Sequence, residues 1–151
     1  MGFWDNLFGG FGGQGRPAGV DLANCPAVAI MRRLNANALI AFEDGYVVAI
    51  EDHFDSDQDR RMYRLEYRSS PDGRRAIAFC LYNPWAPGGP PNGGYSYATC
   101  HVSERGLICL GPGHPSTVSE SSFDLQTAVL RSRYWTVAYS VLRETGTFPN
   151  P

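Results

Sequence analysis

Cys109 is the residue of this sequence best placed to do covalent chemistry. It lies within Gly106–His114, where apolar residues flank it and glycines and a proline bound the segment. Glycine lets a backbone approach a substrate closely, and loops held by a rigid scaffold commonly carry function. Because a cysteine thiolate is a nucleophile that forms thioesters, the pattern predicts a nucleophile or acyl carrier at Cys109. The alternative is a small buried hydrophobic residue, the usual fate of a free cysteine.

A zinc site is the second chemistry that these residue types allow. Its four ligands would be Cys100, His101, Cys109 and His114. The spacing disfavours it, because Cys100 and His101 are adjacent on an expected strand and point to opposite faces. The chain also has no Cys-x-x-Cys pair. We therefore expect no metal there.

The acidic run from residue 51 to 59 resembles a calcium loop only superficially. Asp55, Asp57 and Asp59 alternate as ligands would, and Glu66 stands at the twelfth position. Arg60, however, occupies the place where such a loop needs glycine, and Glu66 falls in an expected strand. The run is expected to be a solvated loop that could dock a basic partner surface.

Composition limits the class of protein. The chain has 151 residues, 43% of them hydrophobic, and a net charge of −2, which suits one folded domain and disfavours nucleic-acid binding through a basic surface. It has no apolar run long enough to span a membrane and no secretory signal pattern. Four unevenly spaced cysteines fit free thiols in a reducing cytoplasm. We expect a flexible glycine and aromatic segment over residues 1–19 and one domain over residues 20–151.

The elements that must position Cys109 follow from local patterns. Helices are predicted over residues 26–34 and from 125 to Gly146, the second with a capping box of Ser121 and Asp124. Strands are predicted over 38–42, 46–50, 62–68 and 75–82, with a further extended segment over 95–102. Loops are expected at 51–59, 83–94 and 103–121. The order predicts an α+β fold with helices packed on one antiparallel sheet.

The motifs in these segments resemble those of the ubiquitin-conjugating enzymes, in a divergent prokaryotic-type form. Leu81–Pro91 is similar to the family's proline-rich loop, His101 stands at its motif histidine, and Gly106–Leu110 matches its Gly-x-Ile-Cys-Leu segment. The similarity covers about residues 26–145, with the specific motifs within residues 81–110. It implies an N-terminal helix, a four-stranded antiparallel meander, an active-site loop and a long C-terminal helix.

The resemblance also implies a mechanism without a cofactor. Cys109 would take the C-terminus of a ubiquitin-like protein from an activating enzyme as a thioester and pass it to an amine of a target protein. His101, Ser103 or Asn83 would donate a hydrogen bond to the oxyanion. His114 would accept a proton or orient the amine, whereas His101 could instead brace the loop through backbone contacts. The expected binding residues lie in the proline-rich loop: Asn83, Trp85, Pro90 and Pro91.

Several positions depart from the family pattern. Val102 and Ser103 stand where the family has proline and asparagine, so the asparagine's role is unassigned. The family's tryptophan after the cysteine is missing, and one long helix ends the chain. Two alternatives therefore stay open. One is a catalytically inactive adaptor that binds a ubiquitin-like protein or another partner through its sheet and acidic loop. The other is a small cysteine hydrolase with Cys109 and His114, for which the sequence offers no third orienting residue.

All 13 basic residues are arginine, and lysine is absent. A GC-rich genome that favours arginine codons is the simple explanation. The functional explanation is that an ε-amine near an acyl thioester would attack it. A carrier without lysine cannot lose its cargo to its own side-chain amines, although its N-terminal amine remains.

Overall fold

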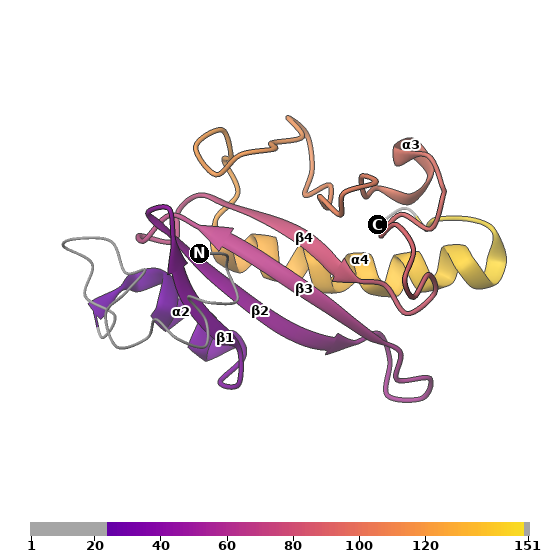
Figure 1. Cartoon of the computed structure of the whole chain (residues 1–151), viewed down its shortest axis with the longest axis horizontal. Coiled ribbons are helices and arrows are strands. Elements are labelled where there is room, and N and C mark those ends of the chain that lie inside the picture. Colours follow the sequence, from indigo (N-terminus) through magenta and orange to yellow (C-terminus); the bar gives the residue numbers. More distant parts are fainter. Residues whose placement is uncertain (1–23, 150–151) are drawn as a thin grey trace.

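The computed structural model describes residues 24–149, which form four strands and three helices. In chain order these are α2 (Pro26–Leu34), β1 (Leu39–Glu43), β2 (Tyr46–Phe54), β3 (Met62–Ser69), β4 (Ala76–Tyr82), α3 (Tyr97–Cys100) and α4 (Leu125–Thr145). The segment predicted for residues 1–19, and the domain boundary at residue 20, lie outside the described residues. The α+β class, the antiparallel sheet and the long C-terminal helix are confirmed (Figure 1).

The sheet is an antiparallel meander in which each strand pairs with the next along the chain. The turn between β1 and β2 places Asp44 and Gly45 at φ of 52° and 84°. Aspartate and glycine tolerate this left-handed conformation, which matches the twist of a two-residue hairpin. The register then pairs Glu43 with Tyr46. Local turn chemistry therefore accounts for the first hairpin.

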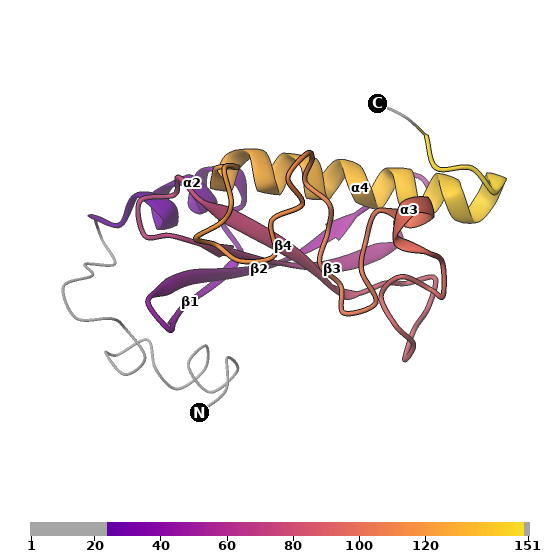
Figure 2. The ribbon, with the colours of Figure 1, turned by 90° about the horizontal axis from the view of Figure 1, so that it is seen from above.

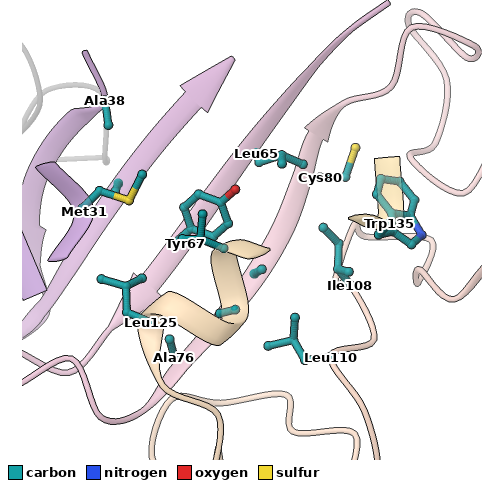
Figure 3. Close-up of a cluster of buried hydrophobic side chains, with 14 of the residues drawn as sticks. Met31, Ala38, Leu65, Tyr67, Ala76, Cys80, Ile108, Leu110, Leu125 and Trp135 are labelled. Carbon is teal, nitrogen blue, oxygen red and sulfur yellow. The ribbon is translucent and has the colours of Figure 1, made fainter. Parts of the chain in front are cut away.

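Both long helices, α2 and α4, lie on the same side of the sheet (Figure 2). The strand face beneath them carries the core, because alternate residues of a strand point to one face. Tyr63, Leu65 and Tyr67 of β3 are fully buried there. Figure 3 shows this core, with Met31 of α2 and Trp135 of α4 facing strand side chains.

A buried ion pair fastens α4 to the sheet. Arg133 of α4 donates to both carboxylate oxygens of Glu51 in β2, at 3.0 and 2.7 Å. Tyr67 and Asn35 also donate to this carboxylate. Burial acts to raise the pKa of Glu51, but the hydrogen bonds from Arg133, Tyr67 and Asn35 outweigh it and lower this pKa. The carboxylate is thus charged, buried and fully partnered.

Three local predictions need correction. β2 continues to Phe54, so residues 51–54 are not loop, because Glu51 and its neighbours pair with β3. Residues 97–100 form a helical turn rather than a strand, since Ser96 accepts a hydrogen bond from the amide of Thr99 and caps it. Asp124 itself is the N-cap of α4, whereas the hydroxyl of Ser121 donates to the carbonyl of Ala76 at 2.6 Å. The predicted capping box was therefore wrong.

The end of α4 agrees with the sequence prediction. Gly146 adopts φ of 83°, and its amide donates to the carbonyl of Leu142 at 2.8 Å. This is the left-handed cap that glycine supplies most easily. Within residues 24–149, no helix combines the length and the apolar character that crossing a membrane requires.

Candidate active site

Two buried side chains hold Cys109 at the surface. Ile108 and Leu110, on either side of it, are 2% and 3% exposed and enter the core beside β4 and α4 (Figure 3). In an extended segment, successive side chains point in opposite directions. Cys109 is accordingly half-buried and faces away from that core. The apolar residues beside the cysteine are therefore anchors for the loop.

Backbone hydrogen bonds fix the same loop between two neighbouring segments. Ile108 donates to the carbonyl of Ala78 at 2.9 Å, and Cys80 donates to the carbonyl of Gly106 at 2.7 Å. On its other side, the amide of Cys109 donates to the carbonyl of His101 at 2.9 Å. The sulfur thus stands on a segment that is held from both sides.

Glycine is required at the start of this loop. Gly106 has φ of 98°, and a Cβ there would lie 2.4 Å from the carbonyl oxygen of Cys80. Any side chain would push the loop off the edge of β4. The close approach that Gly106 allows is to the protein's own strand β4, and approach to a substrate stays a prediction.

His114 lies beside Cys109, as the sequence predicted. Its Nδ1 atom is 3.4 Å from the sulfur, within hydrogen-bonding reach of a thiol. His114 itself adopts φ of 42°, and its amide donates to the carbonyl of Gly111 at 3.3 Å. The loop thus folds back so that an imidazole meets the thiol. This is the arrangement of a nucleophile and its base.

Tyr97 is one site residue that the sequence analysis missed. Its hydroxyl lies 3.3 Å from the same Nδ1 atom of His114. Partial burial, and then contact with Cys109, raise the pKa of Tyr97 well above its ordinary value, so the hydroxyl keeps its proton. No local spacing signals this contact, because 17 positions separate Tyr97 from His114. The sequence analysis predicted an extended segment here and so also missed the helical turn at residues 97–100 that carries Tyr97.

A groove with a cavity volume of about 770 Å³ opens beside Cys109 and His114. Its walls also include Tyr134 and Trp135 of α4, with Phe148 beyond the helix. Arg131 of α4 borders it and donates to the carbonyl of Leu110. The lining is mainly apolar, and its polar members include Cys109, His114 and Arg131. Such a groove can hold an extended, largely uncharged segment next to the sulfur.

His101 has a structural position that also borders the groove. It caps α3 in the left-handed conformation, with φ of 58°, and its carbonyl receives the amide of Cys109. Its ring packs on Phe148 with centroids 4.4 Å apart. The bracing role, one of the two interpretations of His101, is the one these contacts support.

Ser103 and Asn83 are not brought to the groove. Ser103 closes a turn, where its hydroxyl accepts from the amide of Leu107 at 3.0 Å. Asn83 is buried, donates to the carbonyl of Pro91 at 2.7 Å and accepts from the amide of Trp85 at 3.0 Å. Both side chains are thus engaged in holding loops. A donor role toward an oxyanion stays a prediction without geometric support.

The other predicted binding residues of the proline-rich loop, Trp85, Pro90 and Pro91, lie away from the groove. The ring of Trp85 lies under the guanidinium of Arg61 at 4.2 Å, and its Nε1 donates to the hydroxyl of Ser140 at 3.0 Å. Pro91 would lie 3.4 Å from a Cβ at position 106, so this loop abuts the start of the Cys109 segment. Pro90 is exposed. The loop positions the cysteine segment, and none of its four predicted binding residues lines the groove.

A second cavity of about 480 Å³ lies between the end of α2 and the strands β1 to β3. Its lining includes Asn35, Glu51 and Arg64 but no cysteine or histidine. The described residues also contain no group of three metal-binding side chains. Of these two cavities, the groove beside Cys109 is the one lined by a cysteine and by histidines.

Comparisons of the chain with protein-family models, with curated proteins and with solved structures gave no match.

Proposed function

We propose that the protein is a ubiquitin-conjugating-like acyl carrier. Cys109 accepts the C-terminus of a ubiquitin-like protein as a thioester from an activating enzyme and passes it to an amine of a target protein. The observation that carries the proposal is a half-exposed thiol, held by buried neighbours, beside an imidazole at 3.4 Å and at the end of an apolar groove.

Loading exchanges one thioester for another. The Cys109 sulfur, with its proton transferred to Nδ1 of His114, attacks the carbonyl carbon, and the thiolate of the activating enzyme leaves and takes up a proton. Because the carbonyl is already activated, placement and partial removal of water are the main demands on the protein. The groove supplies both, since its apolar walls stand next to the sulfur.

Discharge forms the amide. A target amine adds to the carbonyl carbon, the C–S bond breaks, and the Cys109 thiolate leaves. The amine must lose a proton on the way, and His114 is the base within reach of the sulfur. The absence of lysine fits this step, because no side-chain amine of the carrier competes with the target.

Reconstitution tests the proposal. The full chain is mixed with ATP, an activating enzyme and its ubiquitin-like protein, and the products are separated with and without a reducing thiol. A thiol-sensitive adduct is expected for the wild type and for Cys100→Ala, whose cysteine is buried, but not for Cys109→Ala. Failure of every activating enzyme and modifier encoded beside the gene to load Cys109 would instead support the inactive adaptor.

A cysteine hydrolase is the second candidate, because the contact between Cys109 and His114 suits it equally. In such enzymes a third residue orients the imidazole through its other nitrogen. Within the described residues, no hydrogen bond reaches Nε2 of His114, and both close groups face Nδ1. With a simple ester, a carrier releases about one equivalent of alcohol in a burst and further alcohol only slowly, whereas a hydrolase turns over many equivalents at the initial rate.

A further inference from the structure

Two protic groups share one ring nitrogen at this site. The Cys109 sulfur and the Tyr97 hydroxyl lie 3.4 and 3.3 Å from Nδ1 of His114. A neutral imidazole nitrogen that accepts has a single lone pair in the ring plane. Only one of the two groups can donate a good hydrogen bond to it at a time. The thiol and the phenol are therefore competitors.

The backbone fixes Tyr97 in this position. The carbonyl of Tyr97 accepts from the amide of His101 at 2.8 Å, and the carbonyl of His101 accepts from the amide of Cys109 at 2.9 Å. The tyrosine is thus tied to the cysteine by two backbone hydrogen bonds and not only by its side chain. Its ring meets that of His114 edge to face, with centroids 5.9 Å apart. The backbone position of Tyr97 therefore does not depend on the proton of the Cys109 thiol.

We infer that Tyr97 is a positioning residue that occupies Nδ1 of His114 while Cys109 carries its acyl group, and so slows hydrolysis of the thioester. An acylated sulfur has no proton to donate, so the hydroxyl is then the only donor of the two. While the Tyr97 hydroxyl donates to Nδ1, that nitrogen cannot take a proton from water, and a target amine must displace the hydroxyl before His114 takes its proton. The inference rests on the proposed function, since it concerns the lifetime of the carried acyl group.

A small acyl donor isolates this step from any protein partner. With p-nitrophenyl acetate, the Cys109 sulfur bonds to the acetyl carbon and p-nitrophenolate leaves. In hydrolysis, water adds to the acetyl carbon, the C–S bond breaks, and acetate and the free thiol result. The mass of the acetylated Cys109 peptide, followed with time after removal of the reagent, gives the hydrolysis rate.

Two single tyrosine variants of the full chain test the inference first. Tyr97→Phe removes only the hydroxyl from a residue that is 37% exposed, and Tyr82→Phe, at 39% exposure, is the matched control. A hydrogen bond of ordinary strength corresponds to roughly a 3- to 10-fold change in occupancy of Nδ1. Hydrolysis in Tyr97→Phe is expected to accelerate by about this factor. Tyr82→Phe is expected to match the wild type.

The double variant separates positioning from general loosening of the fold. Tyr97→Phe combined with His114→Asn is expected to hydrolyse at the rate of His114→Asn alone, because the hydroxyl acts through the imidazole. The inference is overturned if Tyr97→Phe hydrolyses at the wild-type rate, or if it accelerates hydrolysis equally in the His114→Asn background. Neither result depends on loading by a ubiquitin-like protein, so this inference and the proposed function can fail separately.

Discussion

The four cysteines of this chain differ in the property that decides thiol reactivity. Burial raises the pKa of the Cys80 thiol to about 12 and also raises the pKa of Cys100. Cys25 is buried and donates to the carbonyl of Pro71 at 3.2 Å. Cys109 alone among the four is half-exposed and beside an imidazole. Because the thiolate is the reactive form, reactivity should be confined to Cys109.

Alkylation of the native protein tests whether Cys109 is the reactive thiol. We expect iodoacetamide at neutral pH to label Cys109 at least about 100-fold faster than Cys80, since Cys80 is buried and its pKa of about 12 leaves almost none of it as thiolate. Peptide mass spectrometry of timed samples measures the two rates. In denaturant the rates should converge, and equal labelling in the native state would contradict the account.

Because the chain has no lysine, one introduced lysine can test whether an amine near Cys109 takes the acyl group from the sulfur. Arg131 borders the groove beside Cys109, and Arg131→Lys places an amine there. After acetylation with p-nitrophenyl acetate, we expect part of the acetyl group to move from sulfur to the side chain at position 131, because amines attack thioesters. Mass mapping detects the transfer. In Cys109→Ala/Arg131→Lys, position 131 should stay largely unmodified; equal acetylation would mean direct reaction with the reagent.

At the scale of elements, the loop that carries Cys109 depends on alternation of buried and exposed side chains. Ile108 and Leu110 are buried. The amide of Ile108 donates a hydrogen bond to Ala78 of β4, and the amide of Cys109 donates to the carbonyl of His101. The strands and α4 were predictable from the sequence because their patterns are local and repeat over many residues. The contact of Tyr97 with His114 depends on how two loops meet in space, which no spacing encodes.

Gly106→Ala tests the placement of this loop. The new Cβ would meet the Cys80 carbonyl at 2.4 Å, in addition to the strain of a positive φ. We expect a loss of about 2–3 kcal/mol of unfolding free energy and slower acetylation of Cys109. Gly45→Ala is the matched control, since it has φ of 84° but open space around it, and should cost about 1 kcal/mol without changing Cys109. Urea unfolding and the acetylation rate measure both effects.

At the scale of the whole molecule, Glu51 joins α2, the sheet and α4. Its carboxylate accepts from Arg133, Tyr67 and Asn35, which come from three other parts of the chain. The sequence analysis placed residue 51 in an acidic loop, because charge content alone does not tell a paired buried carboxylate from a solvated one. The partners that change its role lie far away in sequence, with Arg133 separated from it by 82 positions.

Removing one partner of this pair should destabilise the whole fold. Arg133→Met leaves a buried carboxylate unpaired, and we expect a loss of about 3 kcal/mol at pH 7. Arg64→Met is the control, because its pair with Asp52 is exposed on both sides and should be worth less than about 1 kcal/mol. Urea unfolding measures both. Similar losses in the two variants would contradict the role of Glu51 as a link between layers.

The difference in unfolding free energy between the wild type and Arg133→Met should depend on pH in one direction. The pKa of Glu51 is lowered in the folded state from its ordinary value of 4.5. The stabilisation is therefore complete above about pH 4.5 and is lost as the pH falls through the folded-state pKa. We expect the gap between the wild type and Arg133→Met to shrink over that range. A gap that stays constant from pH 7 to pH 3 would show that the ion pair is not its cause.

The bond that we propose between Cys109 and the carboxyl end of a ubiquitin-like protein can itself be located. In Cys109→Ser, loading by an activating enzyme should leave an ester that resists reducing thiols and yields to mild base. Digestion and tandem mass spectrometry should then find the modifier's C-terminal residue on the hydroxyl of residue 109. Attachment at any other position of the loaded wild type or variant would contradict the account.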